Sequence, residues 1–150
     1  DVYKLVKKVP TRAHIADALK NKGFASSRSE AFRKFLVKGL PAYVDPVGCT
    51  AKEAIEIIKQ AGGKCFIAHP GLVVDSWCFK QWANWGLDGI EIYYPVHHGS
   101  MRDRLSQIAK HYKLLASGGS DFHGKTSGRN HTIGMEVPEE VFEKLKEVFF

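Results

Sequence analysis

The sequence of this 150-residue chain predicts an α/β fold in which parallel strands are covered by helices. Short, mainly apolar runs over residues 65–68, 88–94 and 113–117 have the length and composition of buried strands. Amphipathic helical patterns separate these runs, so helices and strands alternate along the chain. Strands that are apolar on both faces and joined by helices are typical of a parallel sheet, because helices then cover both of its faces.

Two helices are predicted over residues 11–38, ahead of the first strand. Thr11 can cap the first helix, whose apolar residues recur at helical spacing until Gly23 stops it. Residues 27–30 form a capping box for a second helix. We therefore expect residues 1–48 to form a helical subdomain.

From residue 49 onward the pattern changes to alternating helices and strands. A capping box at residues 50–53 opens a helix that Gly62 and Gly63 end. The other predicted elements are a strand at 65–68, a tryptophan-rich helix near 76–85, a strand at 88–94, a helix at 100–112, strands at 113–117 and 133–137, and a closing helix from Pro138. We expect residues 49–150 to form the α/β part of the protein.

Composition and charge narrow the classes of partner. The formal net charge is +6, and much of the basic excess lies before residue 40. Such a surplus suits a polyanionic or phosphorylated partner, and it equally suits a solvated basic surface on amphipathic helices. Neither an apolar run of about 20 residues nor a signal-peptide pattern is found, so we expect no membrane segment.

The cysteines bear on the cellular compartment, and the first residue bears on whether the sequence is a complete chain. Cys49, Cys65 and Cys78 are odd in number and lack C-x-x-C spacing, which favours reduced thiols in a cytoplasmic protein. Because the chain begins with Asp1 instead of Met, we expect processing or truncation ahead of it.

Candidate metal ligands follow two of the predicted strands. His69 ends the first apolar run, and Asp121 and His123 follow the run at 113–117. Residues two positions apart project the same way from an extended backbone, and the carboxyl ends of parallel strands share one edge of the sheet. Carboxylate and imidazole groups are common ligands of divalent metals. The alternative for His69 is a hydrogen bond to the turn that follows it.

Two further candidates lie at and beyond the strand at 88–94. Glu91 is interpreted either as a catalytic base behind the metal ligands or as a salt-bridged strand residue. His97 and His98 follow in the next loop, where one of them could reach a substrate phosphate or protonate a leaving group. Exposure to solvent is the alternative for both histidines, and His97 is our catalytic candidate.

Several motifs occur in an order that resembles the polymerase and histidinol phosphatase (PHP) superfamily, in particular its small bacterial phosphoesterases that act on nucleotides and RNA ends. The motifs are Thr11–Ala16, Phe32–Leu36, Gly39–Val44, Ala61–Gly63, Ala68–Gly71, Gly89–Glu91 and Ser117–His123. The resemblance covers nearly the whole chain. It implies a partial, distorted (β/α)7 barrel, in which residues 1–48 are a helical insertion and residues 49–150 the C-terminal part of the barrel.

The same resemblance implies site residues, cofactors and substrates. His69, Asp121 and His123 would bind divalent ions, two or three in all, with Mn²⁺ the first choice and Zn²⁺, Fe²⁺ or Mg²⁺ the alternatives. Arg12, His14 and Lys34 would grip substrate phosphate, against the alternative of a capping or exposed role. The implied substrates are phosphorylated nucleotides or short RNA 5′ ends.

One departure from the PHP pattern limits what residues 1–150 can do alone. The opening His-x-His motif and the ligands that follow it are not found in this sequence. We expect a fragment, a missing N-terminal half supplied as a separate chain, or self-association, with little activity from this chain by itself. The alternatives are a non-catalytic nucleic-acid or partner-binding module and a histidinol-phosphate-type phosphatase.

Overall fold

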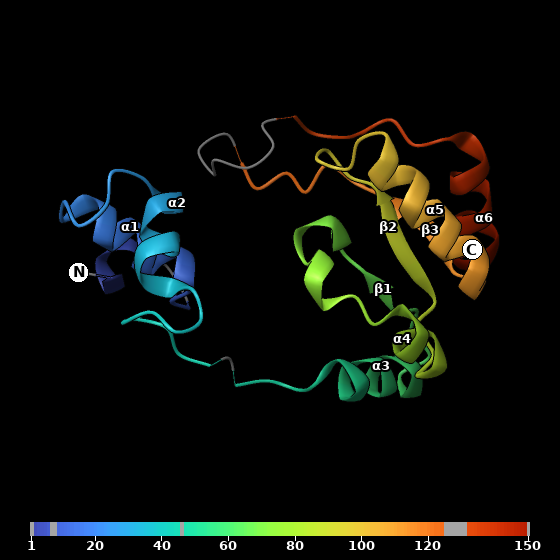
Figure 1. Ribbon diagram of the computed structural model, residues 1–150, viewed down its shortest axis with the longest axis horizontal. Helices are drawn as coiled ribbons and strands as arrows, with labels where there is room; N and C mark the ends of the chain where they lie inside the picture. The colour runs from blue at the N-terminus through green and yellow to red at the C-terminus, as the bar shows by residue number, and fades with distance from the viewer. Residues whose placement is uncertain (1, 7–8, 46, 125–131, 150) are drawn as a thin grey trace. The chain divides into compact units, whose positions relative to one another are not determined.

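The computed structural model describes residues 2–6, 9–45, 47–124 and 132–149. The chain divides into two compact units, Asp1–Gly48 and Cys49–Phe150. The first unit runs from blue to cyan in Figure 1 and the second from green to red. The strands that the structure describes all lie in the second unit.

The first unit is built from short helices. A 3₁₀ turn at Val2–Leu5 is followed by α1 at Arg12–Asn21, and α2 at Arg28–Ala31 continues into a π-helical turn at Phe32–Leu36. Both helices stand where the sequence predicts them, although the second ends in the π-helical turn. The core of the first unit consists of small residues with one larger side chain, namely Ala16, Ala25, Ala31 and Leu36.

An ion pair joins α1 to α2, and a side-chain cap begins α2. Arg28 donates to both carboxylate oxygens of Asp17, from Nε at 2.7 Å and from a terminal nitrogen at 2.6 Å. This hydrogen bonding lowers the pKa of the Asp17 carboxyl. Ser27 caps α2 by accepting the backbone N–H of Glu30 at 3.1 Å, as the capping box predicts.

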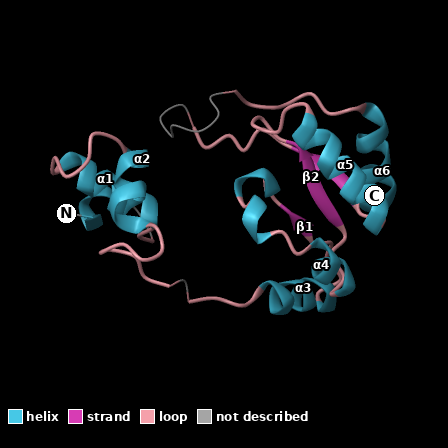
Figure 2. Ribbon diagram, in the orientation of Figure 1, coloured by secondary structure: helices cyan, strands magenta, loops and turns pink. Residues whose placement is uncertain are grey.

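The second unit contains a three-stranded parallel sheet in the order β1-β2-β3, which confirms the predicted parallel arrangement (Figure 2). The strands are β1 at Phe66–Ile67, β2 at Gly89–Tyr93 and β3 at Leu115–Gly118. The helices are α3 at Ala51–Gln60, α4 at Phe79–Asn84, α5 at Ser100–Tyr112 and α6 at Glu139–Phe149. Two further 3₁₀ turns, at Pro70–Leu72 and Val74–Ser76, connect β1 to α4.

Pairing between the first two strands depends on a glycine. Phe66 lies opposite Gly89, and a Cβ at Gly89 would sit only 2.1 Å from the Phe66 ring. The absence of a side chain at residue 89 therefore gives the ring its place across the sheet.

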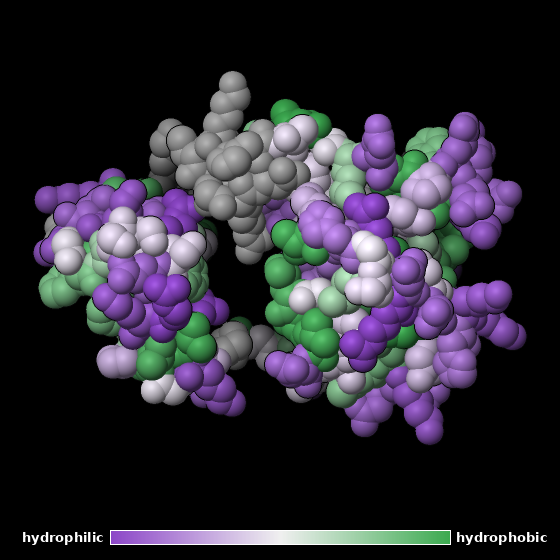
Figure 3. All heavy atoms as spheres, turned by 45° about the horizontal axis from the view of Figure 1, so that its top comes forward, coloured by the Kyte–Doolittle hydropathy of each residue, from purple (hydrophilic) through white to green (hydrophobic). Residues whose placement is uncertain are grey.

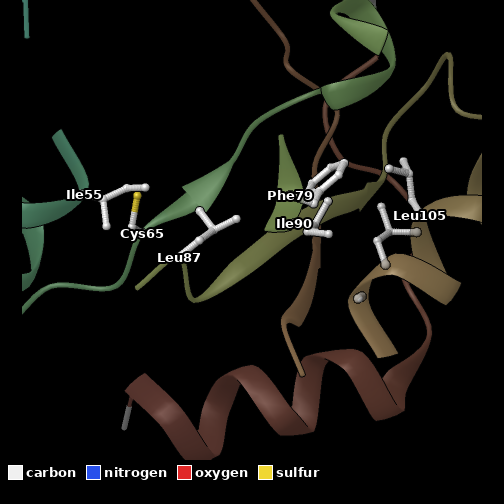
Figure 4. Packing of buried hydrophobic residues seen from close by; sticks show 8 residues of the cluster. Ile55, Cys65, Phe79, Leu87, Ile90 and Leu105 are labelled. Atoms are coloured by element: carbon white, nitrogen blue, oxygen red, sulfur yellow. The ribbon is translucent and has the colours of Figure 1, made fainter. Parts of the chain in front are cut away.

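The main hydrophobic core lies between the sheet and its helices (Figure 4). Ile90 on β2 and Leu105 on α5 are fully buried. Side chains from α3, α4 and the segments around the strands complete the cluster, namely Ile55, Cys65, Phe79, Leu87, Ile92 and Ala109. The cluster therefore joins elements that are far apart in sequence into one core.

The expected strand at residues 133–137 is absent from the described part of the chain, and this prediction is wrong. Gly134 has φ +84°, which breaks an extended run. Its N–H donates to the Ser120 side chain at 3.1 Å, so it is not available to a strand partner. The closing helix after this segment, α6, begins next to Pro138 as predicted.

The surface of each unit is mixed in polarity. Figure 3 shows green hydrophobic side chains interspersed among purple hydrophilic ones on the visible face of each unit. Among the helices of the described residues, none has the length and apolar character needed to cross a membrane.

Candidate functional site

Two candidate ligands sit in strained backbone just beyond strand ends. His69 follows β1 with φ 33° and ψ 56°, and Asp121 follows β3 with φ 50°. Left-handed conformations cost a non-glycine residue about 1–3 kcal/mol, so they persist only where neighbouring groups hold them. Strain of this kind is concentrated at binding and catalytic sites.

The neighbour that holds His69 is Glu91, on the central strand β2. The Glu91 carboxylate accepts the backbone N–H of His69 on Oε2 at 2.6 Å, which is a short, charge-assisted bond. Its other oxygen, Oε1, lies 3.5 Å from the position that a Cβ would take at Gly119, just past β3. Glu91 therefore bonds to the segment that follows β1 and lies beside the segment that follows β3. Its partner is a backbone amide, so the salt-bridge interpretation does not hold among the described residues.

Tyr94 links the two strained residues. Its hydroxyl group donates to Asp121 Oδ2 at 3.2 Å, and its ring centroid lies 5.5 Å from that of His69. Tyr94 is itself buried. Tyr94 is not among the residues predicted from the sequence, although a tyrosine at the end of a buried strand with a polar tip is a usable signal.

Asp121 and His123 lie close together, although Asp121 is left-handed and not in the extended conformation from which their pairing was predicted. His123 Nδ1 lies 2.7 Å from the backbone oxygen of Asp121 and 3.3 Å from its Oδ1. The His123 side chain is about half exposed, whereas that of Asp121 is mostly buried. The imidazole of His69 makes no hydrogen bond to any residue that the structure describes, so both of its ring nitrogens are available to a ligand.

Convergence of these ligands on one ion is not present in this structure. Across residues 2–6, 9–45, 47–124 and 132–149, no three His, Cys, Asp or Glu side chains are placed to hold one metal ion. The donor chemistry, two imidazoles and a carboxylate, still fits a divalent cation. The chain supplies two candidate ligands after β3, Asp121 and His123, and a third, His69, whose ring lies next to that of Tyr94.

His97 occupies a structural position, and a catalytic role does not fit its geometry. It is fully buried, its Nε2 accepts the N–H of Gly71 at 3.0 Å, and its Nδ1 lies 3.0 Å from the Ile92 carbonyl oxygen. Both ring nitrogens are therefore engaged in the neutral form, with Nδ1 as the donor. Burial lowers the pKa of His97 below its ordinary value, which keeps the ring neutral. The neighbouring His98 is exposed.

The candidate phosphate-binding residues of the first unit make local contacts. Arg12 donates to the Leu36 carbonyl, and its guanidinium lies 5.4 Å from the centroid of the Phe32 ring. His14 Nδ1 lies 3.1 Å from the backbone nitrogen of Thr11 and 2.7 Å from its hydroxyl oxygen, so it takes part in the helix cap. Lys34 pairs with Glu30 at 2.8 Å on the surface. Contact of these three residues with substrate stays a prediction.

Curated bacterial enzymes are similar to this chain over much of its length. The 5′-3′ exoribonuclease Rnm of Escherichia coli is 36% identical over 125 residues, which are 75% of this chain and 40% of the relative. A phosphoribosyl 1,2-cyclic phosphate 1,2-diphosphodiesterase of Eggerthella lenta is 35% identical over 64% of this chain and 34% of its own length. A 3′,5′-nucleoside bisphosphate phosphatase of Chromobacterium violaceum is 32% identical over 79% of this chain and 43% of its own length. The chain thus spans less than half the length of these relatives.

Two solved structures are also similar to this chain. A putative metal-dependent phosphoesterase from Bifidobacterium adolescentis matches 97% of this chain and 54% of its own, with 28% identity and a TM-score of 0.72. An amidohydrolase from Chromobacterium violaceum, solved with bound sulfate and no metal, matches the same shares with 26% identity and a TM-score of 0.76. No protein-family model matches the chain.

Proposed function

We propose that this chain belongs to the PHP superfamily and carries part of the active site of a metal-dependent phosphoesterase acting on nucleotides or RNA ends. The observation that supports this most is the group formed by His69, Glu91, Tyr94 and Asp121. These residues come from the segments at the carboxyl ends of three adjacent parallel strands. Ligands of α/β proteins bind at that edge.

In this proposal Asp121, His123 and His69 hold divalent ions, with Mn²⁺ the first candidate and Zn²⁺, Fe²⁺ or Mg²⁺ the alternatives. A bound ion lowers the pKa of a water molecule and polarises phosphoryl oxygens. Glu91 positions His69 through the 2.6 Å bond to its backbone N–H, and Tyr94 orients Asp121 by donating to Oδ2. Glu91 is thus a positioning residue in place of the catalytic base first considered.

Groups outside residues 1–150 complete the site in this proposal. The described ligands do not form a three-ligand set, whereas a multi-metal site needs donors on both sides of the reacting phosphate. We propose that an N-terminal half, a separate chain or a second copy of this chain supplies the missing donors. The sheet would then be one part of a distorted seven-stranded barrel.

Substrate phosphate is assigned to the basic helical unit. Arg12 keeps donors beyond the one used on Leu36, since a guanidinium carries five N–H groups. His14 has its Nε2 left after capping with Nδ1, and Lys34 is on the surface. The chain's net charge of +6 favours an anionic partner.

The test is hydrolysis by the protein assembled with its missing donors, with Mn²⁺ present. The substrates are a nucleoside 3′,5′-bisphosphate and a short 5′-phosphorylated RNA. Asp121→Ala should lower kcat by at least about a hundredfold, because a metal ligand is lost. Asp103→Ala, which removes an exposed carboxylate from α5, is the matched control and should keep parental activity. Parental turnover by Asp121→Ala would refute the assignment.

A non-catalytic nucleic-acid-binding module is the second candidate, favoured by the lack of a three-ligand set among the described residues. RNA titrations at two salt concentrations separate the two functions. Metal-independent binding with a steep salt dependence, together with no turnover by any assembled form, would support the binding module.

A further inference from the structure

A pocket of about 460 Å³ lies between the start of α4 and the outer side of α5. Its wall combines aromatic rings with cations, and its charged lining residues are Lys80 and Arg104 only, among the residues that the structure describes. The aromatic residues are Trp77, Phe79 and Tyr112. We propose that this pocket binds one nucleotide of a single-stranded RNA, at a subsite separate from the candidate metal ligands.

The Trp77 ring is held in place. Its indole N–H donates to the Pro70 carbonyl at 2.9 Å, and the Phe79 ring packs edge-on against it with centroids 5.3 Å apart. A ring fixed in this way loses little freedom when a base stacks on it, which favours binding. Base–aromatic stacking is tolerant of sequence because every base has a π face.

Arg104 supplies the charge. Its guanidinium lies 4.5 Å from the Trp77 ring centroid, although the residue as a whole is exposed. It forms no ion pair with any described residue, so its charge is available to a ligand. A guanidinium in this position can stack beside a base and donate to a phosphate at the same time. Lys80 adds a second cation to the lining of the pocket.

A nucleotide matches both features, because it joins a planar base to an anionic phosphate. An acidic peptide would use the cations and leave the aromatic wall without a partner. The pocket therefore favours a nucleotide over other anionic ligands of the same size.

The pocket is connected to the candidate metal site through the backbone. Pro70, which anchors the Trp77 indole, directly follows His69. In this proposal, an RNA whose end lies at His69 has a later nucleotide on Trp77. This inference rests on the proposed function, since it assumes that the substrate is RNA.

The test measures binding of fluorescein-labelled hexa-adenylate to the full 150-residue chain, in EDTA so that hydrolysis plays no part. Arg104→Gln should weaken binding about three- to tenfold. It should also reduce the salt slope by about 0.7, the value for one phosphate contact in a single strand. Trp77→Leu should weaken binding about five- to hundredfold through lost stacking. Lys110→Gln removes a charge from the same helix outside this pocket and should leave the affinity within twofold of the parent.

Three results would overturn the inference. One is equal weakening by Arg104→Gln and Lys110→Gln, and another is a lack of hexa-adenylate binding by the parent chain. The third is equally tight binding of an oligomer without bases. Arg104→Gln keeps the test decisive if Trp77→Leu fails to fold, because Arg104 is on the surface. A negative result in these binding experiments does not change the hydrolysis result for Asp121→Ala. The two proposals can therefore be refuted separately.

Discussion

Replacing Gly71 by alanine should destabilise the α/β unit, because a methyl group there has no room beside His97. A Cβ at Gly71 would lie 2.6 Å from both Cδ2 and Nε2 of His97. The ring cannot move out of the way, since His97 is 0% exposed and is bonded on both sides. Nε2 accepts the Gly71 N–H at 3.0 Å, and Nδ1 lies 3.0 Å from the Ile92 oxygen.

The expected size of the effect follows from these contacts. Displacing the ring loses one or both hydrogen bonds, at about 1 kcal/mol each. Overpacking of a closed site costs about 1–3 kcal/mol more. We therefore expect Gly71→Ala to lower the free energy of unfolding by about 2–5 kcal/mol, a large part of the stability of a typical domain.

Urea denaturation followed by tryptophan fluorescence measures this change. All three tryptophans, Trp77, Trp82 and Trp85, lie in the second unit, so the signal reports on that unit alone. Gly119→Ala is the matched control, since its Cβ would make an ordinary contact 3.5 Å from Glu91 Oε1. A Gly71→Ala chain with the parental urea midpoint would refute the role assigned to His97.

Three further predictions concern the same unit. Because burial lowers the pKa of His97 from 6.5, the unfolded chain binds its proton at a higher pH than the folded chain. The free energy of unfolding should therefore fall as pH drops below 6.5. In urea titrations above and below that pH, the decrease should be smaller for His97→Asn than for the parent. Glu91→Gln should cost about 1–2 kcal/mol by weakening the bond to His69. It should also weaken Mn²⁺ binding in calorimetry, whereas the exposed control Glu56→Gln should not. Leu105→Ala should lower the free energy of unfolding by about 2–5 kcal/mol, because this core side chain is fully buried, and an unchanged melting curve would contradict the packing described.

Local signals in the sequence located most of the elements. The helix predicted at 100–112 is α5 at Ser100–Tyr112, because its apolar residues repeat at helical spacing. The capping box at Thr50 and Glu53 opens α3 as predicted, with reciprocal hydrogen bonds. Apolar runs located all three strands of the sheet. These patterns depend on neighbouring residues only.

Interactions between residues that are distant in sequence could not be predicted from these local patterns. Glu91 and His69 are 22 positions apart, and the bond between them depends on the order of β1 and β2 in the sheet. His97 looks like an exposed loop residue until Gly71 and Ile92 are seen to enclose it. The run at 133–137 has strand-like composition, but the left-handed φ of Gly134 prevents an extended conformation.

The position of Glu91 also affects how mutations near it should be interpreted. Its two carboxylate oxygens face different loops, one the amide of His69 and the other the backbone at Gly119. Substitutions in either loop are therefore thermodynamically coupled through a shared neighbour, and their effects should not add. Alanine scanning of one loop at a time would assign to each loop a penalty that belongs to both. A double-mutant cycle that includes residue 91 is needed to separate them.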